Sequence, residues 1–370
     1  MSFFLFLLLS FLPFTLTSTS LQLSLLKALS STSTTPNLMF SPLHIYQTLS
    51  LLSNGANGQT QLELLQALNN VNDVSYLNRK HIYYLDNHPK TSPIHVNAIY
   101  TKIQPMENFL SVAKKYKIYV SQYTIAQDVN TWFTNQTNNK INEVITSTDT
   151  NPVDILIINA GMLKIKWKQA FSRYGTFTKE FNNADGTVSK VKMMKLAKNV
   201  KYYETKLVKV IELPFAENKV SAVFFLPKNM TEFINALTDE MLTLILRRLS
   251  KVKVNVEIPK FIIEGNITLI DALKAIGVTK AFSKDKADFG GITNHMKLYV
   301  NNIIHKTMIQ IDEEGSISAM SKGVQALTSF GNSMFMEDIK DFLVDKPFLV
   351  MILDSENSEN MIYIAKVDKL

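Results

Sequence analysis

Apolar runs of strand length recur along this chain between short segments with helix signals, and this order narrows the choice of fold more than any other feature. The β-type runs lie at residues 155–159, 207–213, 221–226, 252–258, 298–311 and 348–353. Strands and helices without strict alternation are typical of an α+β fold with mixed or antiparallel sheets, and not of a parallel doubly wound sheet. No linker and no repeat of fixed period divides the chain, so we expect one folding unit.

Helix signals stand between these runs. Ser41 followed by Pro42 supplies an N-cap hydroxyl and a proline at the first helical position, and the apolar residues after them predict a core helix that ends at Gly55. Two further segments have the form of a capping box, Thr60-Gln-Leu-Glu63 and Thr268-Leu-Ile-Asp271. We expect the second of these helices to end at Gly277.

The N-terminal segment has the pattern of a signal peptide. Residues 1–16 are almost entirely apolar, yet the run is too short to span a bilayer, and Ser18 and Ser20 suit a cleavage site. We expect residues 1–20 to be a signal peptide of a secreted protein and residues 21–370 to be a single domain. Because no Lys or Arg precedes the apolar run, an uncleaved N-terminal helix is the alternative. No later stretch is long and apolar enough to span a membrane.

Three Asn-x-Ser/Thr triplets fit a secretory route. They begin at Asn135, Asn229 and Asn266, and each predicts an N-glycosylation site.

Several classes of site are excluded by what the chain lacks. It contains no cysteine, which rules out a disulfide scaffold, thiol catalysis, thiolate zinc sites and iron–sulfur clusters. The histidines are scattered without metal-ligand spacing, so we interpret them as surface or hydrogen-bonded core imidazoles and expect no metal and no cofactor. No Walker loop, Gly-x-Gly-x-x-Gly, His-Glu-x-x-His or Gly-x-Ser-x-Gly occurs, so we expect that the protein is not an enzyme.

The charge balance is mildly basic. The net charge of +7 comes from 39 Lys and Arg against 32 Asp and Glu, spread along the chain. We interpret it as serving solubility first and weak polyanion binding second. The stretch Lys114-Lys115-Tyr116-Lys117 is short and predicts a solvated helix face rather than a nucleic-acid groove, so we expect no nucleic-acid partner.

Ordered segments carry a family resemblance. They are Asn37-Leu-Met-Phe-Ser41-Pro42-Leu-His-Ile, Asn130-Thr-Trp132-Phe, Lys164-Ile-Lys166-Trp167 after Asn159, Ile258-Pro259-Lys260-Phe261, Ile311-Asp312-Glu313-Glu314-Gly315 and Asp345-Lys346-Pro347-Phe348. Their order and spacing resemble the serpin family from about residue 37 to residue 367. The resemblance implies an α+β serpin fold, with helices around mixed and antiparallel sheets and an exposed reactive-centre loop at about residues 315–345. High Asn, Lys and Ile content indicates an AT-rich genome, with which a viral serpin is compatible.

The resemblance also implies a function. Serpins are monomeric suicide substrates of serine proteases: the protease cleaves the loop, and the loop's N-terminal part inserts into the main sheet. The hinge of that loop would be Glu313, Glu314, Gly315, Ser316, Ser318 and Ala319. Small residues at alternate positions suit a strand that buries one face. Lys322 departs from this pattern, and burying an ammonium costs several kcal/mol unless its head reaches solvent. A serpin fold that no longer inhibits and acts as a binding module for a host or cell-surface partner is therefore the alternative.

The family's register from Glu313 places the reactive bond between Ser329 and Phe330. The loop is several residues longer than we expect for the family, which makes Lys340 the alternative. A serine before the bond suits a protease with a shallow specificity pocket, whereas a lysine suits a trypsin-like one.

A second group of residues matches a polar cluster that in serpins holds the central strands of the main sheet together. These residues are Ser41, Asn159 and His305, and His44 stands where a further serine is usual. Two imidazoles near one hydrogen-bond network would make its closure sensitive to protonation between about pH 5 and 8. The alternative, which we prefer, is that His44 replaces the serine as a neutral hydrogen-bond donor.

Overall fold

The computed structural model describes residues 19–68, 71, 73–87, 93–146, 153–163, 165–216, 219–316, 339–354 and 361–370. The helices are α1 (Thr19–Thr32), α2 (Pro42–Gly55), α3 (Gly58–Ala67), α4 (Val74–Asn87), α5 (Glu107–Tyr116), α6 (Ala126–Gln136), α7 (Met230–Ala236), α8 (Asp239–Arg248) and α9 (Ile270–Ala275), with the short 3-10 turns η2 (Arg173–Gly175) and η3 (Lys280–Phe282). The strands are β1 (Leu38–Phe40), β2 (Pro93–Thr101), β3 (Tyr119–Gln122), β4 (Ile155–Leu163), β5 (Ile165–Lys166), β6 (Phe177–Asn182), β7 (Val188–Glu204), β8 (Val208–Pro214), β9 (Val220–Pro227), β10 (Ser250–Pro259), β11 (Phe261–Thr268), β12 (Val300–Ile311), β13 (Gly315–Ser316), β14 (Lys340–Leu343), β15 (Phe348–Asp354) and β16 (Met361–Val367).

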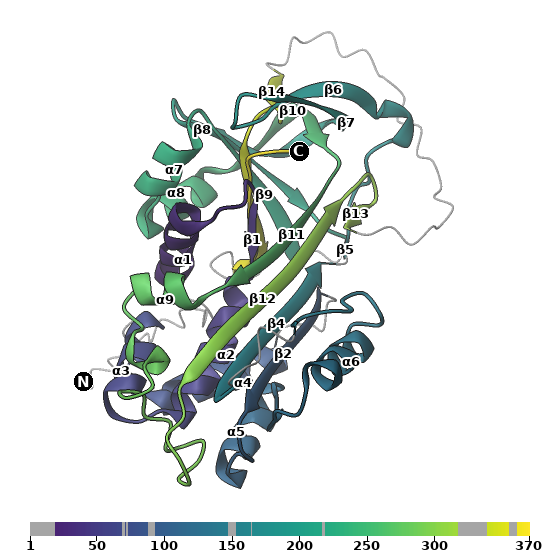
Figure 1. The fold of residues 1–370 in the computed structure, drawn as a ribbon. Coiled ribbons are helices and arrows are strands. Elements are labelled where there is room, and N and C mark those ends of the chain that lie inside the picture. The colour runs from purple at the N-terminus through teal and green to yellow at the C-terminus, as the bar shows by residue number, and fades with distance from the viewer. Residues whose placement is uncertain are drawn as a thin grey trace, which may run out of the picture.

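The described strands form two large sheets. The nine-stranded sheet has the order β1-β16-β15-β9-β8-β7-β10-β14, with β6 paired to β7, and the five-stranded sheet has the order β11-β12-β4-β2-β3. Most neighbours are antiparallel, whereas β4 with β12, β2 with β3 and β10 with β14 are parallel. The expected α+β fold with mixed and antiparallel sheets is confirmed. Figure 1 shows β12, β4 and β2 side by side, with α6 beside them.

The central strand β4 is buried along its whole length because helices cover both faces of the five-stranded sheet. Leu156 and Ile158 pack with Phe133 of α6 on one face. Ile155 and Ile157 belong to the main core on the other face, where α2 contacts β4. Successive residues of a strand point to opposite faces, so a nearly continuous apolar sequence is what a strand covered on both sides requires.

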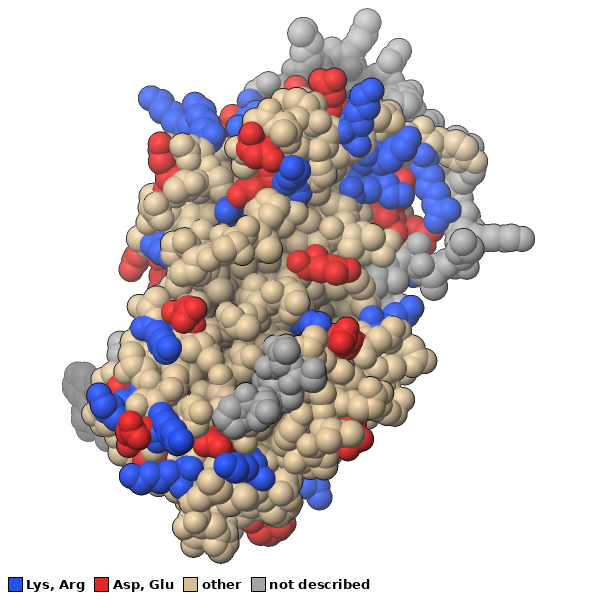
Figure 2. All heavy atoms as spheres, viewed as in Figure 1, with Lys and Arg blue, Asp and Glu red and all other residues tan. Residues whose placement is uncertain are grey.

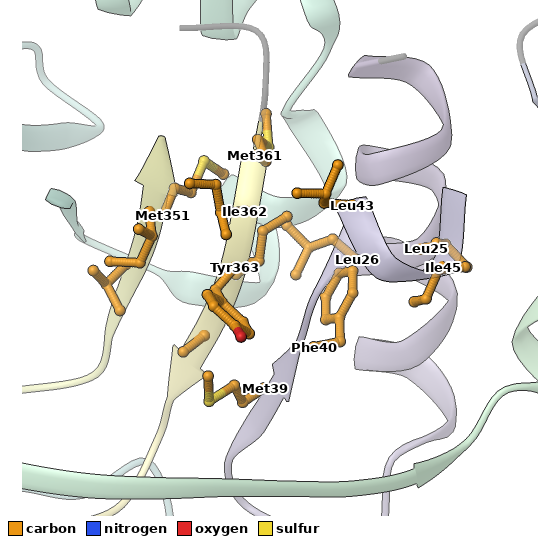
Figure 3. Close-up of a cluster of buried hydrophobic side chains, with 14 of the residues drawn as sticks. Leu25, Leu26, Met39, Phe40, Leu43, Ile45, Met351, Met361, Ile362 and Tyr363 are labelled. Carbon is orange, nitrogen blue, oxygen red and sulfur yellow. The ribbon is translucent and has the colours of Figure 1, made fainter. Parts of the chain in front are cut away.

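The core continues where α1, the start of α2, β1 and β16 meet. Figure 3 shows Met39 and Phe40 of β1 close to Tyr363 of β16, with Leu26 and Leu43 beside them. Phe40 and Tyr363 are among the largest fully buried side chains, and burying such an aromatic ring stabilises the fold by about 2–3 kcal/mol. This packing holds the junction of β1 and α2, which carries Ser41.

Several local sequence signals are confirmed. Each predicted β-type run lies in a strand (β4, β8, β9, β10, β12 and β15) that begins within two residues of the expected position. Pro42 is the first residue of α2, Ser41 Oγ accepts a hydrogen bond from His44 N (3.3 Å), and the helix ends at Gly55. Gly277 follows α9 with φ +100°, a conformation that favours glycine.

Both predicted capping boxes are wrong. Helix α3 begins before Thr60, whose hydroxyl accepts from Asp288 N (3.1 Å), and Glu63 Oε2 accepts instead from the backbone N–H groups of Thr279 (2.7 Å) and Lys280 (2.8 Å). Thr268 is the last residue of β11, opposite Ile304 of β12, and α9 starts after it. In both cases, the side chain or backbone that the local pattern assigned to a helix start interacts instead with residues distant in the sequence.

Charges of both signs are mixed over most of the face in Figure 2, and Lys and Arg gather toward the end of the molecule that carries β6 and β7 in Figure 1. Lys114, Lys115 and Lys117 are exposed at the end of α5 while Tyr116 is buried, as expected for a solvated helix face. None of the described helices is both long and apolar enough to cross a lipid bilayer.

Candidate functional site

The predicted hinge forms a tight turn at the end of β12. Asp312 N donates to Gly315 O (2.8 Å) and Gly315 N donates to Asp312 O (3.3 Å), while Asp312 Oδ1 accepts from Glu314 N (2.9 Å) and Gly315 N (3.1 Å). The chain then reverses into β13, which pairs antiparallel with β5. Gly315 has φ +139°, and a Cβ there would stand 2.3 Å from Ile165 O. The position therefore requires glycine.

A segment after β5 holds this turn in place. Trp167 Nε1 donates to Asp312 O (2.9 Å), and the backbone N–H groups of Trp167 and Phe171 donate to Glu314 O (2.8 Å) and Glu313 O (2.8 Å). The Trp167 indole is stacked on Phe215 with ring centroids 4.4 Å apart. We call residues 167–171 the clamp segment, because its hydrogen bonds reach three successive carbonyls of the turn.

Charged side chains add to this restraint. Glu313 accepts from Thr176 Oγ1 (2.8 Å) and pairs with Lys260 Nζ (2.7 Å), and Glu314 pairs with Arg173. Burial by itself would raise the pKa of Glu313, but the hydrogen bonds from Lys260 and Thr176 outweigh burial and hold this pKa below 4.5. Glu313 is therefore an ionised carboxylate at neutral pH, bonded on both oxygens.

Replacing Trp167 by phenylalanine is expected to loosen the turn. The variant removes the Nε1 donor and leaves the Asp312 carbonyl with only the longer bond from Gly315, which should cost about 1–3 kcal/mol and lower the melting temperature by about 1–4 °C. Circular dichroism during heating measures the shift, and Trp132→Phe is the matched control because Trp132 stacks on Tyr119, away from the turn. A wild-type melting temperature in Trp167→Phe would show that the clamp segment does not depend on this hydrogen bond.

The predicted polar cluster lies beneath the central strands, and the structure brings its members together. Ser41 N donates to His305 Nε2 (2.8 Å) and Ser41 Oγ donates to Ile362 O (2.7 Å). Because a backbone N–H can only donate, His305 Nε2 accepts, and the proton of the neutral imidazole is assigned to Nδ1, which faces Asn159 Oδ1 at 3.4 Å. Ser41, Asn159 and His305 are completely buried, and burial lowers the pKa of His305 from 6.5 to about 3.

The network continues across the sheet to residues that the sequence did not indicate. Asn159 Nδ2 donates to Asn97 Oδ1 (3.0 Å), and Asn97 Nδ2 donates to Gln47 Oε1 (3.0 Å). It therefore joins β12, β4 and β2 to helix α2. Asn97 and Gln47 could have been found only from the register, because Asn97 lies opposite Asn159 in the β2–β4 pairing.

His44 differs from the expectation. Its side chain is completely buried, and within the described part of the chain neither ring nitrogen has a hydrogen-bond partner. The ring lies 5.1 Å from that of His95, 6.4 Å from that of His305 and 5.9 Å from that of Tyr363, measured between centroids. The preferred interpretation of His44 as a hydrogen-bond donor in place of a serine is therefore wrong, although its neutral state agrees with its lowered pKa.

The glycine at position 161 explains how the larger ring fits. A Cβ at Gly161 would stand 2.7 Å from His44 Cε1 and 2.6 Å from the Tyr363 hydroxyl. Burial, with smaller contributions from His95 and His305, lowers the pKa of His44 well below 6.5. His44 and His305 are thus neutral in the folded protein at neutral pH, and protonation of His305 in the folded state falls below the expected window of about pH 5 to 8.

The remaining predicted site residues are either outside the described residues or away from the hinge turn and the polar cluster. Ser318, Ala319, Ser329 and Phe330 are outside the described residues, as is Lys322. Lys340 is the first residue of β14, opposite Val254 of β10. The side chains of Asn135, Asn229 and Asn266 are exposed, in α6, at the N-cap of α7 and in the edge strand β11. Across the described ranges no group of three or more His, Cys, Asp or Glu could hold a metal ion.

Comparison with known proteins bears on this arrangement. A family model described as Serpin (serine protease inhibitor) matches residues 16–369. The plasma serine protease inhibitor of Homo sapiens is 27% identical over 365 residues, which cover 93% of this chain and 87% of the relative. Intracellular coagulation inhibitor 2 of Tachypleus tridentatus is 30% identical over 251 residues, which cover 66% of this chain and 60% of the relative.

Solved structures agree with these matches. The thermophilic serpin tengpin in the native state superposes with a TM-score of 0.87 at 26% identity, covering 95% of this chain and 93% of that one. Serpin48 of the insect Tenebrio molitor superposes with a TM-score of 0.84 at 25% identity, covering 95% and 96%.

Proposed function

Because the chain belongs to the serpin family and has the serpin fold, we propose that it inhibits a serine protease as a suicide substrate. The protease would cleave the loop beyond Leu327, and the N-terminal part of the loop, still bonded to the protease as an ester, would insert into the five-stranded sheet as a new strand. Loop insertion is a known behaviour of serpins. Insertion would begin at the turn between β12 and β13.

The observation that carries the proposal is the direction of three strands. β12 and β4 are parallel neighbours, hydrogen-bonded from Val300 to Met308, and β13 has already reversed beside β5, just beyond the end of β4. A strand continuing from β13 would therefore run antiparallel to both β12 and β4. Its insertion would replace one parallel ladder by two antiparallel ladders, and antiparallel pairing is slightly more stable per residue.

Two sets of contacts oppose this insertion before cleavage. The clamp segment and the partners of Glu313 and Glu314 hold the turn in which insertion begins. Beneath the sheet, β12 and β4 are joined by the contact between His305 and Asn159, which at 3.4 Å is long for a hydrogen bond. Parting the strands would break this contact.

Incubation with a small panel of serine proteases tests the proposal. The panel includes an elastase-like, a chymotrypsin-like and a trypsin-like enzyme, because the loop carries residues for each specificity. A covalent band that survives denaturing electrophoresis is the expected result for at least one enzyme. Cleavage of the loop by all of them with no such band would rule out inhibition of these enzyme classes.

That outcome would favour the second candidate, a serpin fold that acts as a binding module. Lys322 is the observation in its favour. Alternation with Ser316 and Ser318 along the sequence would put this lysine on the inward face of an inserted strand, where an unpaired ammonium opposes deep insertion.

The bond attacked is expected to be Ser329-Phe330. The alternative bond after Lys340 lies in β14, whose residues pair with Val254 to Glu257 of β10, so a protease would first have to detach that strand. Mass spectrometry of the released C-terminal peptide identifies the bond. A peptide that starts at Phe330 supports the prediction, whereas one that starts at Asp341 would contradict it and indicate a trypsin-like target.

A further inference from the structure

A pocket of about 290 Å³ lies between the clamp segment and the strands β7, β8 and β10. Its size is near the lower end of the range, about 300–1,000 Å³, that small-molecule sites occupy. Neither the turn at Gly315 nor the polar cluster around His305 lines it.

The floor of this pocket is apolar and rigid. It is formed by the buried side chains of Trp167, Phe171, Val200 and Leu213. The indole of Trp167 is fixed by its stack on Phe215 and by its hydrogen bond to Asp312 O. A flat or extended apolar group could therefore bind without reorganising the floor, which lowers the entropic cost of binding.

The rim of the pocket is cationic. Four lysines line it, Lys168, Lys198, Lys201 and Lys251, against one carboxylate, Glu212. Lys201 pairs with Glu212 (2.8 Å) and Lys198 contacts Gln169. The exposed Lys168 and Lys251 have no acidic partner among the residues that the structure describes. The pocket thus carries a net charge of +3, from four lysines minus one glutamate.

We propose that this pocket binds a small amphipathic organic acid, with an apolar body on Trp167 and Leu213 and a carboxylate or sulfonate between Lys168 and Lys251. The apolar floor favours a ligand with an apolar body over a uniformly charged polyanion. The unpaired lysines favour an anion over a neutral or cationic ligand of the same shape, because ammonium groups form charge-assisted hydrogen bonds with a carboxylate.

Binding at this position would act on the hinge. Trp167 and Phe171, which the ligand would cover, donate the hydrogen bonds that hold Glu314 and Glu313. A ligand that binds the native arrangement and not a released turn stabilises the native arrangement by mass action. We therefore expect bound acid to slow loop insertion, a consequence that, unlike binding itself, rests on the proposed function.

The binding experiment uses the two tryptophans of the chain, Trp132 and Trp167. In the Trp132→Phe variant only Trp167 remains, so energy transfer to 8-anilinonaphthalene-1-sulfonate reports probe bound within transfer range of Trp167, and the lysine variants described below assign that signal to this pocket. We expect saturable transfer that laurate displaces, whereas dodecyltrimethylammonium, a cation with a tail of the same length, leaves it unchanged. Absence of transfer, or equal displacement by the cation and the acid, overturns the proposal.

Charge reversal supplies the matched comparison. Lys168→Glu with Lys251→Glu should weaken naphthalenesulfonate binding at least tenfold, and Lys114→Glu with Lys115→Glu, which alters the net charge equally at the exposed end of α5, should leave it unchanged. Lys168→Gln with Lys251→Gln, which removes the charge without introducing carboxylates, should weaken binding by a smaller factor. Equal binding by all three variants overturns the proposal.

The regulatory consequence has its own measurement. Laurate should reduce the rate of covalent complex formation with a responsive protease in the unmodified protein but not in the Lys168→Glu/Lys251→Glu variant. An equal rate with and without laurate overturns the consequence. If no protease forms a complex even without laurate, the proposed function fails while the result from Trp167 energy transfer still decides the binding site.

Discussion

Ser316→Arg is expected to convert the protein from an inhibitor into a substrate. Ser316 ends β13 and pairs with Ile165 of β5, so it is the first step of any strand that continues into the sheet. Alternate residues of such a strand become buried, and burying an unpaired guanidinium costs several kcal/mol. A penalty of about 3 kcal/mol would slow insertion about a hundredfold. Hydrolysis of the ester would then overtake insertion and release active protease.

Denaturing electrophoresis with a responsive protease measures the effect. The covalent band should fall at least tenfold and be replaced by cleaved inhibitor. Ser316→Thr, which adds no charge, and Asn294→Arg, which places the same charge on an exposed loop, should both retain the band. An undiminished band in Ser316→Arg would show that inhibition does not require insertion of this residue.

Lowering the pH from about 7.5 to about 5 is expected to destabilise the folded protein by several kcal/mol. The pKa of His305 is lowered from 6.5 to about 3, that of His81 is lowered from 6.5 to about 4, and that of His44 is lowered well below 6.5, in each case mainly by burial. Below pH 6.5 the unfolded chain therefore binds more protons than the folded chain. The stability is complete above pH 6.5 and declines as the pH falls toward the folded-state values.

The size of this effect follows from linkage. Each buried histidine contributes up to about 1.4 kcal/mol per pH unit, or about 2 kcal/mol between pH 6.5 and pH 5. The lowered pKa of Glu313 acts below 4.5 and in the same direction, because its stabilising ionised form is lost as the pH falls through that lowered pKa. The loss of stability between pH 7.5 and pH 5 is therefore attributed to the histidines and not to Glu313.

Urea unfolding across this pH range gives the slope of the free energy of unfolding. His44→Ser should flatten the slope because it removes one titrating group, whatever the cavity left above Gly161 does to the absolute stability. Asn294→Ser, which removes no ionisable group from an exposed loop, should keep the wild-type slope. If the slope of His44→Ser equals that of the wild type, His44 does not titrate as its burial requires.

Much of the fold could be predicted from the sequence because its signals act over short distances. Ser41 and Pro42 mark the start of α2 through contacts within one helical turn. The apolar run that becomes β4 predicts a strand because side chains alternate along the backbone. The ordered segments that resemble serpins predicted the family, the hinge at Gly315, and the meeting of Ser41 and Asn159 with His305.

Tertiary structure decided what depends on residues far apart in the chain. Glu63 has the spacing of a capping residue but accepts hydrogen bonds from the backbone of Thr279 and Lys280, and no local pattern contains that pairing. His44 was interpreted as a substitute for a serine donor, yet the packing of α2 against β4 places its ring over Gly161, without a hydrogen-bond partner for either nitrogen among the described residues.

The pocket at Trp167 also depends on the tertiary structure and not on local sequence signals. Trp167 and the strand segments that carry Leu213 and Lys251 are separated by dozens of residues, and each reads locally as an ordinary strand or loop residue. Local propensity depends on neighbours within about one turn or one strand, so it determined the elements and their order in this protein. Which side chains meet is set by strand register and packing, since a shift of one residue turns every side chain of a strand to the opposite face.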